Sequence, residues 1–290
     1  MTGNKTSLHP ELLRTAGQEP ISPFQVRVSR RRLGRDFWYA AIVPCLAFLV
    51  VPVLALLFYE NPKTILANLD GRQVAQAVTL SATTTIITTL ITLLIGTPVA
   101  YVLPRIKGWG HRLIETIIDL PVVLPPAVAG IALLMAFGRR GLIGTYLHAA
   151  GIDIPFTTAA VVLAQLFVAA PYFIKTASVG FAAIDPDTKE AAALDGASRF
   201  ATFLYVSLPL TRNAILSGAI LTFARALGEF GATIIFAGNL PGRTQTMPLA
   251  IYIGFQINLN VALALSIMLI AVSFLVMFIT RMLLNDPQRG

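Results

Sequence analysis

A charged segment at residues 185–196 stands out in a chain that is 56% hydrophobic and only 12% charged. Asp185 is a favourable N-cap, Pro186 suits the first helical position, and acidic residues in the first turn interact well with the helix dipole. Gly196 can end such a helix in a left-handed conformation. The segment therefore predicts a short helix followed by a sharp break.

Three apolar residues follow this predicted helix at helical spacing. Phe200, Phe203 and Leu204 recur at i, i+3 and i+4, which gives a second short segment an apolar stripe. Such a stripe can fill a groove on another protein. It can also pack against the protein's own helices, and the residues alone leave both interpretations open.

The composition places these segments in a membrane protein. Mean hydropathy is +0.73. Stretches without Asp, Glu, Lys or Arg cover residues 37–59, 73–104, 120–138, 154–174 and 244–280. A helix needs about 20 residues to cross a hydrocarbon core, so each stretch can hold a span. The chain is predicted to be an all-α, polytopic membrane protein and not a water-soluble one.

Six membrane spans are expected, at about 37–59, 74–103, 113–137, 156–180, 208–237 and 261–283. A basic tail, residues 1–36, precedes the transmembrane domain at 37–290. Sixteen Lys and Arg residues then face one side and five face the other, so the positive-inside rule places both termini in the cytoplasm. The polar, uncharged stretch 244–260 is predicted to be re-entrant or superficial.

Several functional classes are disfavoured by the residue inventory. The net charge of +8 is better explained by cytoplasmic loops than by nucleic-acid binding. A lone cysteine, Cys45, excludes an intramolecular disulfide, and the three histidines lack ligand spacing. There is no GxxxxGK[ST] loop for ATP. We expect no metal or cofactor bound by this chain and no catalytic constellation, so the chain is not predicted to be an enzyme.

Arg225 and Glu229 lie four residues apart in the fifth expected span, on one helical face where they can pair. Sixteen residues from Pro209, at about 1.5 Å each, place Arg225 about 24 Å along a straight helix, in the outer half of the membrane. Charges at this depth usually face a bundle interior or water. A structural ion pair and a direct contact with a transported anion both remain possible.

Three prolines fall within six residues of the third expected span: Pro121, Pro125 and Pro126. Proline removes a backbone donor and kinks a helix, and in lipid the freed carbonyls need partners from neighbouring helices or water. The stretch predicts a kinked helix, which either lines a pathway or simply packs.

A family resemblance rests on seven positions at fixed spacing: Glu190, Ala191, Ala192, Gly196, Val206, Leu208 and Pro209. They resemble the EAA loop of permease subunits of ABC importers, with Val206 where that family usually has Ile. The resemblance implies that residues 185–209 form a coupling loop whose helix docks into a cleft of a cytoplasmic ATPase subunit. Glu190 and Gly196 would be the coupling residues, with Phe200, Phe203 and Pro209 in the same surface.

A second resemblance covers Ala226–Ala232 and continues through 238–248. It is similar to the permeases for molybdate, tungstate and sulfate, and the Ala232–Thr233 pair and the 240–243 turn are closer to the molybdate members. This adds Asn239 to Arg225, Glu229, Pro125 and Pro126 as candidate pathway or gate residues. Together the two resemblances cover about residues 74–283.

The resemblance implies a type I ABC importer permease fold in the inner (plasma) membrane, surrounded by lipid. Two copies, most simply a homodimer, would form an alternating-access path for a tetrahedral oxyanion: molybdate or tungstate, with sulfate as the alternative. Implied partners are two ATPase subunits, which hold ATP and Mg, and a periplasmic or extracellular oxyanion-binding protein.

Two other classes remain as alternatives. An ion-gradient-driven secondary transporter would show mid-membrane acidic residues and inverted repeats. A membrane scaffold or intramembrane enzyme would lack a docking loop. Copurification with an ATPase separates these classes.

Overall fold

The computed structural model describes residues 30–59, 61, 63 and 71–283, and these form helices and connecting turns with no strand among them. The all-α prediction is confirmed for this part of the chain. The chain divides into two units, Met1–Leu54 and Ala55–Gly290, which are described separately. Of the predicted basic tail, residues 1–29 lie outside the described residues.

Helix α1 (Arg30–Phe58) contains the first expected span. It begins before that span, so residues 30–36 of the predicted tail are helical. Its stretch Ile42–Phe58 is apolar, and Pro44 and Pro52 lie inside the helix.

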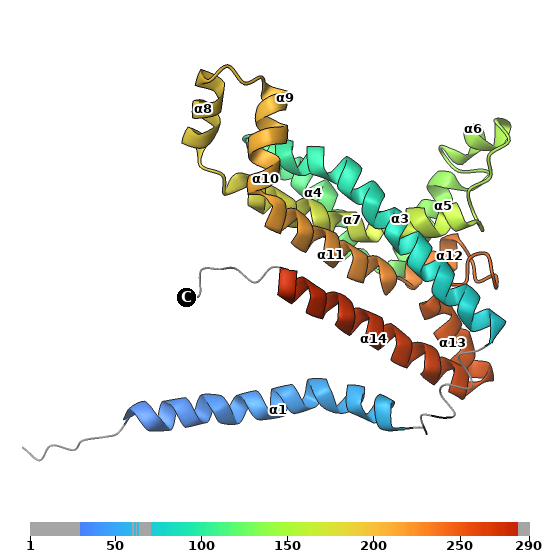
Figure 1. Ribbon diagram of the computed structural model, residues 1–290. Helices are drawn as coiled ribbons and strands as arrows, with labels where there is room; N and C mark the ends of the chain where they lie inside the picture. Colours follow the sequence, from blue (N-terminus) through green and yellow to red (C-terminus); the bar gives the residue numbers. More distant parts are fainter. Residues whose placement is uncertain (1–29, 60, 62, 64–70, 284–290) are drawn as a thin grey trace, which may run out of the picture. The chain divides into compact units, whose positions relative to one another are not determined.

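The second unit is built around three packed helices, α3 (Arg72–Val102), α7 (Thr158–Ala182) and α11 (Arg212–Leu227), seen together in Figure 1. The Phe173 ring of α7 packs directly against two glycines, Gly96 of α3 and Gly218 of α11, where these three helices meet. A Cβ atom on Gly96 of α3 would lie 2.7 Å from the Phe173 ring, and one on Gly218 of α11 would lie 3.0 Å from it. The glycines therefore permit a close approach that larger residues would prevent.

Helix α14 (Leu259–Leu283) packs with α13 (Met247–Ile257). Helices α3, α7 and α14 agree closely with the second, fourth and sixth expected spans. Three helices are long and apolar enough to cross a membrane, or up to five if each bent pair counts as one span. The described residues therefore support a multi-span protein but do not reproduce the count of six exactly.

The third expected span is two helices, α4 (Trp109–Val123) and α5 (Pro126–Phe137), bent by 113°. The prediction of one kinked helix over 113–137 is wrong. Leu124 and Pro125 have ψ angles of 134° and 136°, as expected for residues that precede a proline. The two consecutive prolines thus break the helix completely.

The fifth expected span, 208–237, is also not one helix. It follows α9 (Arg199–Ala201) and the π-helix η2 (Thr202–Ser207) and begins with α10 (Leu208–Leu210). The chain then bends by 73° before α11 begins. It breaks again at residues 228–230, before α12 (Gly231–Phe236). The straight-helix distance from Pro209 to Arg225 therefore does not apply.

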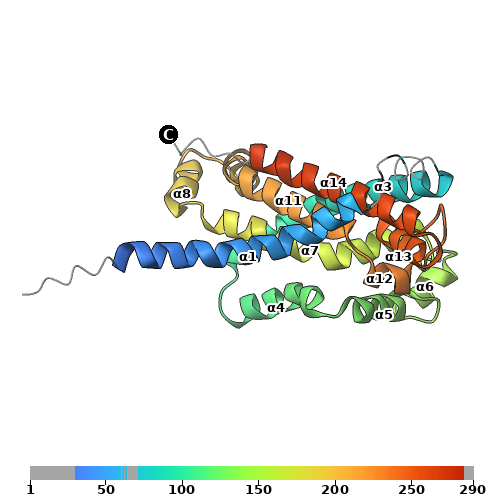
Figure 2. The same ribbon diagram turned by 90° about the horizontal axis from the view of Figure 1, so that it is seen from below.

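The second unit has two distinct ends. Helix α8 (Pro186–Leu194) lies at one end, and α6 (Gly144–Ala149), α12 and α13 lie toward the other, as Figure 1 and Figure 2 agree. The 3-10 turn η1 (Leu103–Arg105) directly follows α3. Before α13, the polar residues Thr244, Gln245 and Thr246 are buried. The first three residues of the stretch 244–260 are therefore inside the protein, and the prediction that the stretch is re-entrant or superficial stays a prediction.

Candidate functional site

The loop at residues 185–209 has the predicted local structure at α8. The Asp185 carboxylate accepts the Asp187 amide hydrogen at 3.0 Å, and Pro186 occupies the first position of α8. At the other end Gly196 adopts φ +83°, and the amides of Gly196 and Ala197 donate to the Ala193 and Ala192 carbonyls. This pair of bonds is the Schellman arrangement, which favours glycine.

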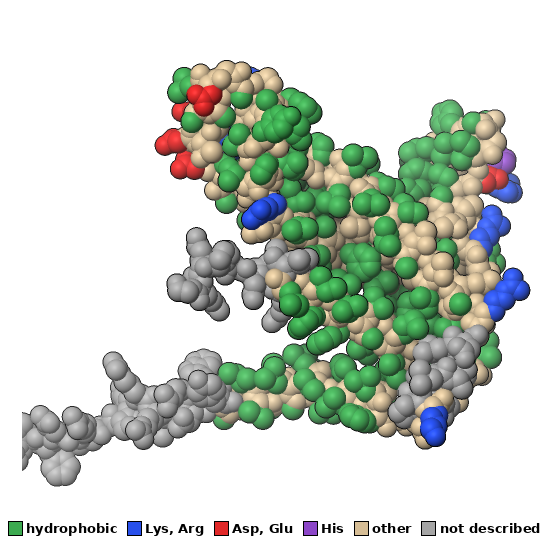
Figure 3. All heavy atoms as spheres, viewed as in Figure 1, with side chains coloured by type: hydrophobic (Ala, Val, Ile, Leu, Met, Phe, Trp, Pro, Cys, Tyr) green, Lys and Arg blue, Asp and Glu red, His purple; other side chains and the backbone are tan. Residues whose placement is uncertain are grey.

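The outer side of this loop is exposed. Glu190, Ala191 and Gly196 are exposed, and α8 has no buried residue. Large apolar side chains of the same loop are exposed as well: Leu194 is 89% exposed, Phe200 72% and Tyr205 75%. Figure 3 shows acidic side chains gathered over the same end. A mixed apolar and acidic surface of this kind fits a protein partner better than lipid.

The structure splits the predicted apolar stripe. Phe203 does not share the exposed face of Phe200, and its ring centroid lies 4.6 Å from that of Tyr101 on α3. Phe181 of α7 stands 5.3 Å from Tyr101 in the same group. Of the two readings of the stripe, Phe200 fits partner docking and Phe203 fits packing on the protein's own bundle. Pro209, in α10, is exposed.

Basic side chains lie between α8 and the end of α3. Arg105 stacks on the Tyr101 ring at 3.4 Å and donates to the Tyr101 carbonyl. Partial burial, with the nearby Arg105 charge, lowers the pKa of Lys189 on α8. Lys189 of α8 and Arg105 of η1 are therefore like charges close enough to interact.

Arg225 and Glu229 form the predicted ion pair, with Nη1 and Oε2 2.8 Å apart. Glu229, however, lies beyond the end of α11, so the two do not share a helical face as expected. Its other carboxylate oxygen accepts the Ala232 amide hydrogen at 2.8 Å. The Glu229 side chain is 2% exposed and that of Arg225 27%. The pair therefore holds the break between α11 and α12.

The structure brings one proline of the third expected span to this break. A Cβ atom on Gly231 would lie 2.4 Å from the Pro126 Cβ, and one on Gly130 would lie 2.7 Å from the Ile235 Cβ. Helices α5 and α12 are thus closely packed beside Glu229. Pro125 is exposed at the start of α5.

Asn239 lies in the turn that follows α12. Its Oδ1 atom is buried and has no hydrogen-bond partner among the described residues. None of the contacts described for this part of the chain joins it to Arg225 or Glu229. Its place in a pathway stays a prediction.

Two charged clusters were missed in the sequence. Lys175 of α7 lies 2.8 Å from Asp119 of α4. Asp119 lies at the edge of the uncharged stretch 120–138 and Lys175 at the edge of the stretch 154–174. The third and fourth expected spans therefore each contained one of these opposite charges, and this was the signal in the sequence for an ion pair.

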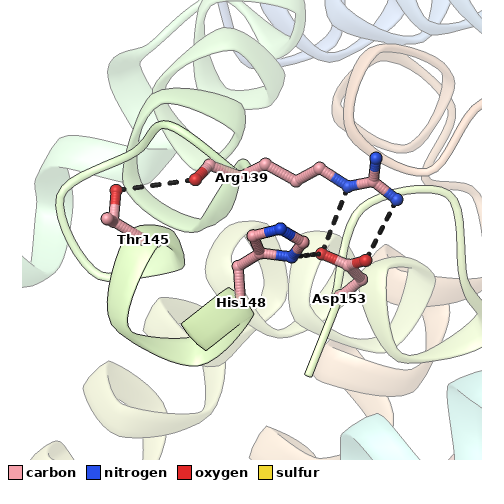
Figure 4. Close-up of polar contacts among 4 residues, drawn as sticks. All are labelled: Arg139, Thr145, His148 and Asp153. Carbon is pink, nitrogen blue, oxygen red and sulfur yellow. Dashed lines mark hydrogen bonds and ion pairs between the residues drawn. The ribbon is translucent and has the colours of Figure 1, made fainter. Parts of the chain in front are cut away.

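The other missed cluster lies beside α6. Arg139 donates two hydrogen bonds to Asp153, at 3.3 and 3.0 Å, and His148 Nδ1 lies 2.9 Å from the same carboxylate, as Figure 4 shows. The hydrogen bonds from Arg139, and then from His148, lower the pKa of Asp153. Within the described residues no group of three His, Cys, Asp or Glu could hold a metal ion.

The structure thus combines several candidate membrane spans with a capped, exposed loop helix at one end, as the resemblance to ABC importer permeases implies. Residues 93–286 match the family described as binding-protein-dependent transport system inner membrane component. The chain belongs to this family of multi-pass inner-membrane permeases, which are transport subunits and not enzymes.

Curated relatives share much of the chain. The molybdenum transport system permease protein ModB of Mycobacterium tuberculosis is 42% identical over 238 residues, which cover 82% of this chain and 90% of the relative. The probable transport system permease protein NifC of Clostridium pasteurianum is 34% identical over 239 residues, covering 82% and 84%. A probable sulfate transport system permease protein, cysT of Nephroselmis olivacea, is 34% identical over 228 residues, covering 77% and 80%.

Solved structures show the same fold at low identity. A bacterial ABC transporter involved in alginate import aligns with a TM-score of 0.69 at 16% identity, covering 90% of this chain and 99% of that one. The MetNI methionine ABC transporter aligns with a TM-score of 0.57 at 17% identity, covering 73% and 94%. The predicted ABC importer permease fold is confirmed.

Proposed function

We propose that this chain is the permease subunit of an ATP-driven importer that moves a tetrahedral oxyanion, molybdate or tungstate, across the inner membrane by alternating access. The 42% identity to a molybdenum permease over most of both chains supports the anion class. Sulfate has the same charge and shape and is the second candidate, supported by the 34% identical sulfate-type relative.

One observation carries the coupling role. Helix α8 is capped at both ends, has no buried residue, and presents Glu190 beside the exposed Leu194 and Phe200. A rigid helix with an apolar edge fits a groove on a partner. That partner would be a cytoplasmic ATPase, two copies of which hold ATP and Mg. An ion-gradient-driven secondary transporter binds no ATPase subunit and would not need such a docking surface.

The transport path would lie between two copies of the chain, with an oxyanion-binding protein on the outside. The closely packed α5 and α12 would form part of the outer closure, held by Arg225 and Glu229. Because the binding protein selects the anion, the path itself need not bind it tightly. Alternating access then requires only that α8 and the spans move together.

Orientation can be tested with two cysteines placed on either side of α7. Leu142 is 83% exposed near α6, and Asp187 is exposed on α8. In a Cys45→Ala background, an impermeant maleimide should label Leu142→Cys in intact cells and Asp187→Cys only after permeabilisation. Thr244 is 0% exposed and serves as a poorly labelled control. Labelling of both sites in intact cells contradicts the proposed topology.

Copurification tests the ATPase partnership. The chain, extracted in mild detergent, should retain a stoichiometric ATPase, and Leu194→Asp should release it because a charge would replace an apolar contact. Phe255, which is 72% exposed on α13 at the other end, provides the matched control Phe255→Asp. Retention of the ATPase by Leu194→Asp and its loss from Phe255→Asp would place docking elsewhere.

A further inference from the structure

Two phenylalanines of the coupling loop, three residues apart, point in different directions. Phe200 on α9 is 72% exposed. Phe203, in the π-helix η2, packs instead against Tyr101 at a centroid distance of 4.6 Å and against Phe181 at 6.3 Å. Tyr101 and Phe181 are 5.3 Å apart and nearly perpendicular, at 80°. Tyr101 thus makes edge-to-face contacts with both phenylalanines, a favourable arrangement for aromatic side chains, while the two phenylalanine rings are tilted by 35° to each other.

The two rings that receive Phe203 belong to a tightly packed body. Phe181 and Phe173 of α7 share one buried cluster with Ala100 of α3. Phe173 also occupies the notches at Gly96 and Gly218, and a Cβ atom on Gly180 would lie 2.4 Å from the Ala214 Cβ of α11. Close-packed interiors transmit displacement instead of absorbing it. A displacement of Tyr101 and Phe181 therefore moves α3, α7 and α11 together.

None of the residues of α8 is buried, and the element on which α8 packs is η2. The polypeptide that follows it leads into η2, where Phe203 is one of the partly buried residues packed on the α3–α7 cluster. π-helical turns inside α-helical segments are rare and are often found at functional sites. Here the π-helix is the element that holds Phe203 against the bundle.

We infer that Phe203 is a positioning residue that transmits movement of the coupling helix to α3 and α7 through Tyr101, whereas Phe200 contacts the ATPase. The inference rests on the proposed function and assigns separate roles to two residues of one loop. It follows that loss of Phe200 should weaken assembly, and loss of Phe203 should leave assembly intact but disconnect ATP hydrolysis from transport.

The test uses the full transporter in proteoliposomes, with its ATPase and its oxyanion-binding protein, and compares Phe203→Ala with Phe200→Ala. Phe203→Ala should bind the ATPase as wild type does and still hydrolyse ATP. The number of anions imported per ATP should fall by about twofold to thirtyfold, the range of coupling changes along such routes. Phe200→Ala should instead lose ATPase binding, and the complexes that remain should have the wild-type ratio of anions to ATP.

A double-mutant cycle separates transmission from general damage. If Phe203 transmits movement through Tyr101, Tyr101→Leu should lower the ratio of anions to ATP, and adding Phe203→Ala should cause little further loss. Tyr101→Phe, which keeps the ring, should retain wild-type coupling. If Phe203→Ala accumulates poorly, Phe203→Leu gives the same comparison with less lost volume.

Two results overturn the inference. One is an unchanged ratio of anions to ATP in both Phe203 variants, and the other is loss of ATPase binding by Phe203→Ala equal to that of Phe200→Ala. Failure of the proposed function is distinguishable, because then the wild-type complex itself would show no ATP-dependent uptake.

Discussion

Glu229 uses its two carboxylate oxygens to join two helices: Oε2 lies 2.8 Å from the Arg225 guanidinium at the end of α11, and Oε1 accepts the Ala232 amide hydrogen of α12 at 2.8 Å. Gly228 and Phe230 flank it in the break between those helices. One buried side chain thus fixes the direction in which α12 leaves α11. This is a structural role, and it leaves the guanidinium of Arg225 partly exposed.

Removing the charge of Glu229 should destabilise the protein. Glu229→Gln keeps an oxygen for the Ala232 amide but leaves Arg225 without its counter-charge, at a cost below the about 2.5 to 3.5 kcal/mol that insertion scales give an arginine at the centre of a membrane helix, because Arg225 is 27% exposed. We expect a lower protein level and a lower detergent melting temperature. Arg225→Met combined with Glu229→Gln should recover much of both.

Transport by that double variant then separates the two roles of Arg225. Recovery of both protein level and oxyanion uptake means that Arg225 makes no essential anion contact. Recovery of protein level without uptake means that it does. A double variant no more stable than Glu229→Gln contradicts the structural pair.

Gly196 should be required for its backbone conformation. Its φ is +83° and no atom lies within 4 Å of a Cβ built there, so Gly196→Ala introduces strain of about 1 to 2 kcal/mol without a clash. The end of α8 should then shift and transport should fall while the protein still inserts. Gly151, with φ +79° and equal space, is the matched control near α6. Equal transport losses in Gly196→Ala and Gly151→Ala would show that strain, and not the coupling loop, is responsible.

The Lys175–Asp119 pair should link α7 to α4. Because the two side chains are 48% and 34% exposed, we expect Asp119→Asn to cost only about 1 kcal/mol of stability, read as a small fall in melting temperature. Exchanging the charges, with Asp119→Lys and Lys175→Asp together, should restore more stability than either single change leaves. If the stability loss of the double variant equals the sum of the losses of the two single variants, the two side chains do not interact directly.

Asp153 should hold the α5–α7 connection through Arg139. Hydrogen bonds from Arg139 lower the pKa of Asp153 below its ordinary value of 3.8, so its contribution is present above that value and is lost only as pH falls through the lower, folded-state pKa. Between about pH 5 and pH 8 the pair should therefore not weaken through protonation of Asp153.

Trypsin offers a direct test of this pair. Added from outside at neutral pH, it should cleave at Arg139 faster in Asp153→Asn than in wild type, because the arginine is released. Cleavage after Arg243, an exposed arginine in a different turn, should stay the same and serves as the internal control. Identical rates at Arg139 in the two proteins would show that the ion pair does not restrain the loop.

Helix α8 could be predicted from the sequence because every residue that defines it acts locally. Asp185 caps it, Pro186 begins it and Gly196 ends it, so no distant contact was needed. The long spans α3, α7 and α14 were predictable for a similar reason, since hydropathy and length determine them.

Features that depend on direction or on distant contacts could not be predicted. A hydropathy profile gives the length of an apolar stretch but not the direction of the chain within it. It therefore could not predict the 113° bend between α4 and α5. Phe200 and Phe203 share a face in an α-helix, but the chain becomes a π-helix at Thr202 and the shared face is lost. The Lys175–Asp119 pair joins residues 56 positions apart, and only the packing of α4 on α7 brings them together.

ATP-dependent uptake of labelled molybdate into proteoliposomes tests the central claim most directly. The liposomes contain this chain and its ATPase, with ATP on the ATPase side and the oxyanion-binding protein on the other. We predict uptake that requires ATP and the binding protein, is reduced by unlabelled tungstate, and is abolished by Glu190→Ala with Gly196→Leu while the protein still inserts. Uptake driven by an ion gradient without ATP, or wild-type uptake by that double variant, would contradict the account.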